Sequence, residues 1–407
     1  MLEKLMAGFI RTGRLTIIRA NGRRLEFGRA PPDAPHLDVA VRLASRWTAL
    51  KVLLRPALGF GEAYMDGEIV LERGSLSDLF ELANRNLPHR RKWYVPVLSR
   101  LSLALRRRWQ QWNSRRAAKR NAAHHYDLSE TLFRGFLDRD MQYSCAYFQE
   151  PSLSLEAAQA AKKRHIMAKL LLRPGLRVLD IGSGWGGLAL DIARSGARVT
   201  GITPAAEQIA VARRRAEAAG LSGAARFEQR DYREIEGPFD RIVSVGMFEH
   251  VGAPNYSAFF RRIARLLAGD GVALIHAIGR IDGPGTTDAW TRKYIFPGGY
   301  IPALSDVLPA VEQSGLWVTD IEILRLHYAE TLRQWRSRFL AQRDAMRALY
   351  DERFCRMWEL YLAGSEMAFR HGGLMVFQLQ LARRVETVPL TRDYMHDQEH
   401  ALIAAAE

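Results

Sequence analysis

The stretch at residues 178–187, VLDIGSGWGG, constrains the fold of this chain more than any other part of the sequence. An apolar run ends there in a glycine-rich turn, and helical spacing follows. Glycine allows a ligand to approach the backbone N–H groups of such a turn closely. The apolar run RVLDI is followed, in alternation with helical segments, by RVTGI, ARFEQ, RIVSV and VALIH. This alternation predicts a parallel, doubly wound α/β sheet.

The charge beside the glycine turn indicates which ligand it would hold. Gly182, Gly184 and Gly187 also match the dinucleotide fingerprint G-x-G-x-x-G, so the glycines alone do not decide the cofactor. Asp180 would repel a pyrophosphate, whereas S-adenosylmethionine carries a sulfonium and an ammonium group and no phosphate. Thr203 follows RVTGI, where a dinucleotide site would carry an acid for the ribose. The sequence therefore favours S-adenosylmethionine.

A second polar position follows the third expected strand. Asp231 and Tyr232 lie where open α/β sheets bind ligands, and Asp231 is placed to receive an adenine amine. The alternative for such an acid is a helix N-cap or a surface turn.

The chain is longer than one hydrophobic core usually serves, with 407 residues, so two domains are expected. Residues 1–88 mix short apolar runs with turns and then helical spacing, which predicts a small α+β domain. Residues 89–121 form a basic aromatic linker, and residues 122–407 form the catalytic domain. Helical spacing dominates from Glu330 to Arg384, apart from a break at Gly372-Gly373.

Much of the net charge of +15 lies in one stretch, because residues 82–126 contain no Asp or Glu. Arginines there alternate with Trp93, Tyr94, Trp109 and Trp112. Cations with amphipathic aromatics suit an anionic lipid surface or a nucleic acid, and a solvated linker helix is the third interpretation. The sequence shows no secretory signal or membrane-spanning run, and only two cysteines, which fits a cytoplasmic protein.

One motif suggests a metal. His396 to His400 fits H-x-x-E-H, which places two histidines one helical turn apart, as in some zinc hydrolases. It lies close to the end of the sequence, so we expect a surface helix that is mobile and holds no metal.

Several blocks resemble the cyclopropane-fatty-acyl-phospholipid synthase family, which includes the mycolic acid methyltransferases. In order, they are HHYDLSETLFRGFLD, MQYSCAYF, VLDIGSGWGG, GITPAAEQ, FDRIVSVGMFEHVG, KYIFPGGYIP and HYAETL. The stretch FGEAYMDGEIV is similar to the small leading domain of the full-length bacterial synthases, so residues 1–88 would be a membrane-associating domain. The resemblance implies a class I, Rossmann-like methyltransferase fold for the catalytic domain.

The resemblance also implies a set of site residues. Those expected to contact S-adenosylmethionine are Tyr143, Ser144, Asp180, Gly182, Ser183, Gly184, Trp185, Gly186, Thr203, Gln208, Asp231 and Tyr232. The family holds a bicarbonate ion as general base, and the matching catalytic positions are Cys145, Glu249, His276, Ile278 and Tyr328. Taken singly, Cys145 would be a small buried hydrophobe, His276 a strand-end histidine and Glu249 a helix cap.

The implied reaction transfers a methylene group from S-adenosylmethionine to the cis double bond of a phospholipid acyl chain and closes a cyclopropane ring. Aromatic faces would stabilise the intermediate carbocation, and the residues considered for this are Tyr143, Tyr147, Phe148, Phe248 and Tyr294. The family's usual cysteines are replaced at Ser183 and Ser365, so a nucleophilic thiol at position 365 is excluded. The expected enzyme is a homodimer, peripheral on the inner face of the bacterial cytoplasmic membrane.

Three other functions compete with this one. A fatty-acyl methyltransferase would use the same site and give a methyl-branched or methyl-unsaturated chain without ring closure. A nucleic-acid methyltransferase would bind its substrate through the basic stretch, but no N/D-P-P-Y/F-type motif or base-recognition module is present. A lipid-binding protein with an inactive site is disfavoured by the retained acids and the glycine turn.

Overall fold

The structure is a computed structural model that describes residues 8–86 and 129–404. The chain forms two compact units, each assembled from segments that are far apart in sequence. The first unit comprises Met1–Ala104, Thr287–Phe296 and Leu332–Gly373, and the second comprises Leu105–Thr286, Pro297–Thr331 and Leu374–Glu407. The linear boundaries at residues 88 and 122, and the linker between them, lie outside the described residues and remain predictions.

The first unit contains a four-stranded sheet with strand order β2-β1-β3-β4. Its strands are β1 (Gly13–Ile18), β2 (Arg24–Arg29), β3 (Asp38–Leu43) and β4 (Ile69–Arg73). The sheet shares a core with helices of the same unit, so the small α+β fold expected near the N-terminus is confirmed. The helices are η1 (Pro35–Leu37), α2 (Arg46–Leu54), α3 (Pro56–Met65), α4 (Leu76–Asn86), α12 (Ala289–Tyr294), α15 (Arg343–Leu349) and α16 (Glu352–Arg370).

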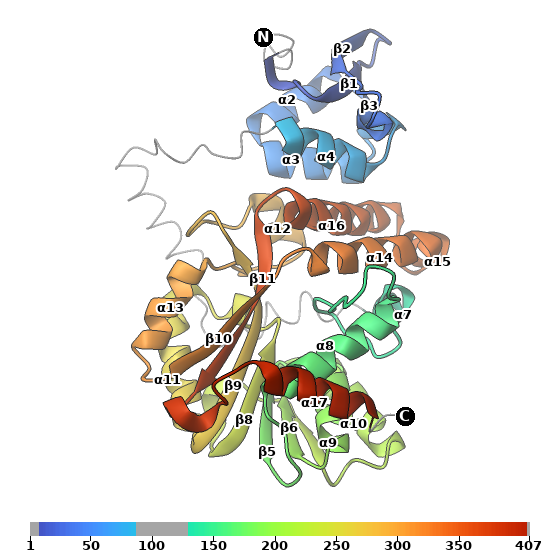
Figure 1. Cartoon of the computed structure of the whole chain (residues 1–407). Helices are drawn as coiled ribbons and strands as arrows, with labels where there is room; N and C mark the ends of the chain where they lie inside the picture. Colours follow the sequence, from blue (N-terminus) through green and yellow to red (C-terminus); the bar gives the residue numbers. More distant parts are fainter. Residues whose placement is uncertain (1–7, 87–128, 405–407) are drawn as a thin grey trace. The chain divides into compact units, whose positions relative to one another are not determined.

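The second unit is built on a seven-stranded sheet with order β10-β11-β9-β8-β5-β6-β7 (Figure 1). The five strands from β9 to β7 pair in parallel, as the alternating pattern predicted. The order reverses between β5 and β8, which is where open α/β sheets form a ligand crevice. The strands are β5 (Arg177–Ile181), β6 (Arg198–Ile202), β7 (Ala225–Glu228), β8 (Phe239–Val245), β9 (Leu267–Arg280), β10 (Trp317–Leu324) and β11 (Leu374–Ala382).

Helices cover both faces of this sheet (Figure 1). On one face α11 (Tyr256–Leu266) and α13 (Leu304–Glu312) pack in a core with Phe259 and Val307. On the other, residues of α8, α9 and α10 form a second core. The remaining helices are α7 (Glu130–Phe136), α8 (Leu155–Lys169), α9 (Gly187–Arg194), α10 (Ala206–Ala218), α14 (His327–Ala341), α17 (Asp393–Ala404), η2 (Tyr232–Glu234), η3 (Phe248–His250), η4 (Ala253–Asn255) and η5 (Val385–Thr387).

The prediction of helix up to Arg384 is wrong after the glycine break. Leu374–Ala382 forms β11, which pairs antiparallel with both β9 and β10. The segment LMVFQLQLA is buried on both faces, so it lacks the alternation that marks a half-buried strand. A short apolar run of this kind does not distinguish a strand from a buried helix.

Candidate active site

A cavity opens at the carboxyl ends of β5, β6 and β8, at the point where the strand order reverses. It collects all the predicted donor-binding residues except Gly186, from segments between Tyr143 and Tyr232. Additional lining comes from Met141, Gln142, Leu188, Arg230, Arg233, Met247, His250, Pro297 and Gly298, among others. The structure therefore brings together in one cavity all but one of the residues predicted to contact the donor.

The glycine turn holds its shape through backbone contacts. Gly182 and Ser183 both donate their amide hydrogens to the carbonyl of Ile202, so these two N–H groups tie the turn to β6. Gly182 has a φ of +86°, and a Cβ there would lie 2.8 Å from Cβ of Met247. Gly186 instead faces the core, because its missing Cβ makes room for Ala212 and Phe227. It is a packing residue between the turn, α10 and β7.

Asp180 is the buried charge of the cavity. Its side chain is 3% exposed, and within the described part of the chain its carboxylate makes no hydrogen bond or ion pair. Burial raises the pKa of Asp180 to about 7, and the positive charge of Lys162 only partly opposes this. A cationic ligand group would stabilise the ionised form.

The polar residues that follow β6 and β7 make hydrogen bonds with other side chains. Thr203 donates from Oγ1 to Oε1 of Gln208 at 3.0 Å, which fixes the orientation of the Gln208 amide in the cavity wall. Asp231 lines the cavity but forms a bidentate pair with Arg233, whose Nε lies 2.8 Å from Oδ1. An adenine amine would therefore have to share this carboxylate with a guanidinium, which the sequence had not indicated.

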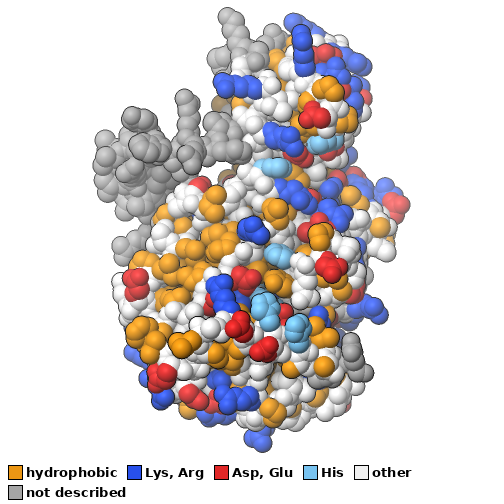
Figure 2. Space-filling view, viewed as in Figure 1, with side chains coloured by type: hydrophobic (Ala, Val, Ile, Leu, Met, Phe, Trp, Pro, Cys, Tyr) orange, Lys and Arg blue, Asp and Glu red, His pale blue; other side chains and the backbone are white. Residues whose placement is uncertain are grey.

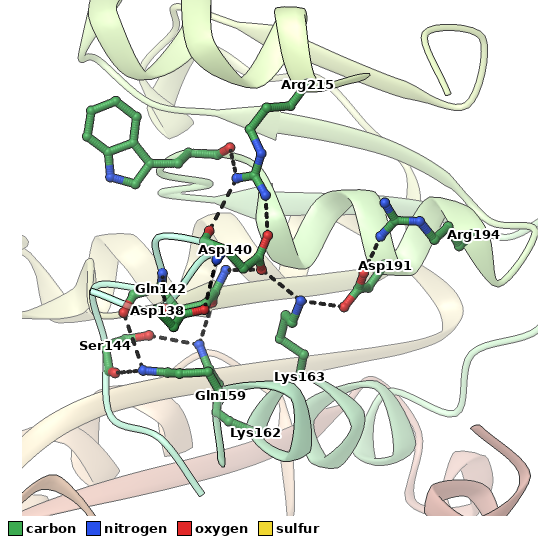
Figure 3. A network of polar contacts seen from close by, with 11 residues as sticks. Asp138, Asp140, Gln142, Ser144, Gln159, Lys162, Lys163, Asp191, Arg194 and Arg215 are labelled. Atoms are coloured by element: carbon green, nitrogen blue, oxygen red, sulfur yellow. Dashed lines mark hydrogen bonds and ion pairs between the residues drawn. The ribbon is translucent and has the colours of Figure 1, made fainter. Parts of the chain in front are cut away.

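A buried network from α8 shapes the loop that carries Tyr143 and Ser144 (Figure 3). The ammonium of Lys162 donates to Oε1 of Gln142 at 2.5 Å and to Oγ of Ser144 at 3.0 Å. Gln159 donates to the Ser144 carbonyl at 2.9 Å. These contacts hold the loop in place, because buried donors of α8 satisfy acceptors of the loop, although Oε1 of Gln159 has no hydrogen-bond partner among the described residues.

The same loop is anchored further along by Asp140 (Figure 3). Its carboxylate receives Lys163 at 2.7 Å and is ion-paired with Arg215 from α10. Arg215 also donates to the carbonyl of Trp185, at 2.8 Å, so it joins the loop to the glycine turn. Lys163 and Arg215 were not identified from the sequence, in which they are ordinary charges on helical segments.

The predicted general-base residues fall into two groups. In the first, Oε1 of Glu249 accepts from the backbone N–H of Ile278 at 2.6 Å, and His276 lies two residues earlier on β9. Oε2 of Glu249 is buried without a hydrogen-bond partner among the described residues. Burial raises the pKa of Glu249 to about 7, although the backbone hydrogen bond opposes it.

The second group contains Cys145 and Tyr328, which are both buried. Thr331, one turn after Tyr328 on α14, accepts the backbone N–H of Ala146 at 3.0 Å and so connects the two segments. Burial raises the pKa of the Cys145 thiol well above its usual range, which disfavours the thiolate form. Lys162 influences the pKa values of Asp180, Cys145 and His276, so its charge reaches the donor cavity and both base groups.

Of the five aromatic residues considered for carbocation stabilisation, only Tyr143 lines the cavity. Phe248 packs against Tyr256 and Phe260 in the core of the second unit, and Tyr147 stacks between two histidines. Tyr294 belongs to the first unit, where its hydroxyl donates to Glu62 at 2.9 Å. Phe148 stacks on His327.

The H-x-x-E-H motif lies on α17, which is a surface helix as expected, while the expected mobility of this segment stays a prediction. His396 and His400 are exposed, whereas Glu399 is buried and bonds through Oε1 to Nδ1 of His165 on α8. The acid therefore docks the helix and does not converge with the two histidines. Within residues 8–86 and 129–404, no group of three or more His, Cys, Asp or Glu side chains is arranged to hold a metal ion.

The parallel sheet and the cavity at its strand reversal define the class I methyltransferase fold. Coclaurine N-methyltransferase, solved with S-adenosylhomocysteine, shares this fold with a TM-score of 0.65 at 21% identity, covering 79% of this chain and 98% of that one. The structure of the mycolic acid cyclopropane synthase CmaA1 with S-adenosylhomocysteine matches with a TM-score of 0.62 and 33% identity, over 65% of this chain and 98% of the other.

Sequence comparisons narrow the class to one family. The family model for mycolic acid cyclopropane synthetase matches residues 113–379. Tuberculostearic acid methyltransferase UfaA1 of Mycobacterium tuberculosis is 38% identical over 378 residues, covering 88% of this chain and 85% of that protein. Cyclopropane-fatty-acyl-phospholipid synthase of Escherichia coli K12 is 38% identical over 363 residues, covering 88% and 90%. This chain belongs to the cyclopropane synthase family, and it is an enzyme of the S-adenosylmethionine-dependent methyltransferase class.

Proposed function

We propose that this enzyme adds a methylene group from S-adenosylmethionine to the cis double bond of an unsaturated acyl chain in a membrane phospholipid. Transfer of a one-carbon group from S-adenosylmethionine to fatty-acyl chains is the chemistry of its family. The observation that carries the proposal is Asp180, a carboxylate buried in the cavity without a partner in the described structure. Such a site favours a cationic ligand.

The residues of the cavity fit the methyl donor by charge and by hydrogen-bonding capacity. Asp180 would pair with a cationic group of S-adenosylmethionine. The amide of Gln208, which is held by Thr203, would be available to hydrogen-bond a polar group of the same molecule. The wall formed by Tyr143 and Ser144 is held by the α8 network, so it needs no rearrangement to accept a ligand. A rigid wall lowers the barrier by aligning the sulfonium methyl with the double bond.

A buried oxygen without a hydrogen-bond partner supports the proposal that the base site holds a bicarbonate ion. Oε2 of Glu249 is buried and unpaired, and a Glu with a pKa of about 7 can be protonated there and donate to an anion. When bound, bicarbonate would supply a base that removes a proton from the transferred methyl group. Alkylation leaves a cation on the acyl chain, and loss of that proton gives its C–H electron pair to the ring-closing bond. Glu249 and His276 would orient the base.

A methyl-branched product is the second candidate, because UfaA1 matches this chain as well as the cyclopropane synthase does. In that reaction the same cation would lose a proton from a neighbouring carbon, either directly or after a hydride shift within the acyl chain, and the C–H electron pair would form the new double bond. Both products require the same donor cavity, so the position of the base decides between them.

Helix α2 supports a membrane-borne substrate. It exposes Trp47 (63%) and Leu54 (70%) together with Leu50 and Leu53, and the helix contains no acid. The guanidinium of Arg46 lies 5.0 Å from the Trp47 ring centroid. A short helix with aliphatic and Trp side chains beside cations is typical of an element that lies in the lipid headgroup region. We infer that α2 contacts an anionic bilayer.

The surface agrees with this interpretation. Basic side chains are prominent over the N-terminal part of the first unit on the face shown in Figure 2. No helix of the described residues is long and apolar enough to cross a membrane. We propose a homodimer that associates peripherally with the inner face of a bacterial cytoplasmic membrane and uses no nucleic acid.

The test is to incubate the purified protein with methyl-labelled S-adenosylmethionine and vesicles of monounsaturated phospholipid, and then to analyse the fatty acids by mass spectrometry. A labelled one-carbon gain on a chain that resists mild hydrogenation is expected for ring formation. The same gain on a chain that is still reducible would replace it by methylation without closure. Label that enters nucleic acid and no lipid would overturn the proposal.

A further inference from the structure

A buried polar chain leads from β10 to His276 through residues that have no part in the donor cavity. Glu322 on β10 is ion-paired with Lys169 at the end of α8, and Lys169 donates from Nζ to Oε1 of Gln378 at 2.8 Å. Gln378 lies opposite His276 in the β9–β11 register, and its Nε2 lies 3.2 Å from Nδ1 of His276. Lys169, Gln378 and His276 are each at most 2% exposed.

The order of hydrogen-bond donors along this series of buried residues determines which ring nitrogen of His276 carries the proton. A lysine ammonium can only donate, so the Gln378 atom that faces Lys169 is its carbonyl oxygen. The amide nitrogen of Gln378 is therefore the atom that faces His276, and it donates to Nδ1. A nitrogen that accepts a hydrogen bond carries no proton, which places the proton of neutral His276 on Nε2.

Burial lowers the pKa of Lys169, and its ion pair with Glu322 opposes this effect. Burial disfavours the ionised forms of both Lys169 and Glu322, but hydrogen bonds from His165 and Lys169 outweigh burial at Glu322 and lower its pKa to about 2. Glu399 on α17 holds the other side of His165. The acid beside Lys169 is thus ionised throughout the physiological range.

We propose that Lys169 and Gln378 are positioning residues that hold His276 as a neutral imidazole with its proton on Nε2. Within the described residues Nε2 has no hydrogen-bond partner, which leaves this N–H for a bound anion. The charged groups that act on His276 are Lys162, Lys169 and His165 from α8 and Glu322 from β10. Burial and the two lysines together lower the pKa of His276 to about 3.

This inference rests on the proposed function for its chemical meaning. A neutral N–H donor orients a bicarbonate ion without protonating it, whereas an imidazolium at the same place would weaken the base. The arrangement thus preserves the basicity on which proton removal from the transferred methyl group depends. The tautomer itself is independent of any substrate.

The experiment is ¹⁵N NMR of the histidine rings in the full-length protein, with the His276 signals identified by their loss in His276→Gln. We expect Nε2 protonated and Nδ1 unprotonated from about pH 6 to about pH 8, with no titration of this ring. In Gln378→Glu a carboxylate replaces the amide donor, so we expect the proton to move to Nδ1 and the ring to titrate. Gln380→Glu is the matched control, because Gln380 is equally buried on β11 but bonds to the Lys169 carbonyl and Tyr394.

The pH profile of lipid labelling gives the functional readout. Gln378→Glu should lose on the order of tenfold in turnover, the scale of effect when a group that orients a functional histidine is removed. A wild-type ring protonated on Nδ1, or a tautomer unchanged in Gln378→Glu, would overturn the inference, and the wild-type spectrum decides even if the variant does not fold. The expected tautomer in a protein that labels no lipid would uphold the positioning and refute the proposed function.

Discussion

Replacing Asp180 with Asn should stabilise the protein while abolishing donor binding. The carboxylate is buried, and among the described residues it has no hydrogen bond that Asn would lose. Asn is nearly isosteric and stays neutral, so it removes an uncompensated charge from the cavity at little steric cost. A group retained at the expense of stability is the expected signature of a ligand-binding residue.

The size of the effect follows from the pKa of Asp180, which burial raises from the ordinary 3.8 to about 7. The native state then binds more protons than the unfolded state between these two values, so the stability of the wild type falls as pH rises through this window. At 1.36 kcal/mol per pKa unit, the penalty is on the order of 4 kcal/mol above pH 7 and on the order of 2 kcal/mol near pH 5. Asp180→Asn should recover these amounts.

The assay is denaturant unfolding of wild type and variant near pH 5 and near pH 8, with calorimetry for S-adenosylmethionine binding. Asp231→Asn is the control, because Asp231 lines the same cavity but is paired with Arg233, so its loss relieves no unpaired charge. Donor affinity of the wild type should also weaken about tenfold per pH unit below pH 7, since the cation must displace a proton. The reasoning would be refuted by an Asn variant that is no more stable than the wild type at pH 8. It would also be refuted if the difference in free energy of unfolding between variant and wild type were the same at pH 5 and pH 8.

The other predictions concern the base site, the loop and the membrane. Glu249 has a pKa of about 7, so the bicarbonate concentration needed for half-maximal activity should rise as pH rises and the carboxyl becomes an anion. Steady-state kinetics of Glu249→Gln, whose side chain stays neutral, should show no such rise at alkaline pH. Gly187→Ala would place a Cβ 2.2 Å from Oδ2 of Asp140, so donor affinity should fall at least about tenfold by calorimetry, and unchanged affinity would contradict the network. Leu54→Glu should reduce flotation with anionic vesicles at least about fivefold, whereas Leu390→Glu, another exposed leucine, should float normally; equal loss in both would argue against α2.

The sequence was informative wherever local chemistry determines local structure. The turn from Asp180 to Gly187 and the strands around it were predicted correctly, because glycines, an acid and apolar runs leave few alternatives there. The contact between Glu249 and Ile278 agrees with the predicted grouping of base residues. Gly186 was assigned to the ligand through the family resemblance, and this assignment stays a prediction, because its Cβ position faces Ala212 and Phe227 and it does not line the cavity.

The residues that sequence reasoning missed act through contacts between distant segments. No sequence motif singles out Lys162 and Lys169 on their helix, yet both are buried, since their partners come from a loop and from β10 and β11. Gln378 lies in an apolar run that was interpreted as helix, and its neighbour in space is 102 residues away. Pairings of this kind depend on strand order, which no local pattern encodes.

The strand β11, which carries the hydrogen-bond partner of His276, is synthesised after all the segments that line the donor cavity. Every residue that lines the donor cavity precedes position 299, whereas β11 begins at Leu374 and must then insert between β9 and β10. A chain emerging from the ribosome could therefore complete its donor cavity well before the imidazole acquires its partner. The protein would become able to bind its co-substrate first and to catalyse the reaction only after β11 has been synthesised.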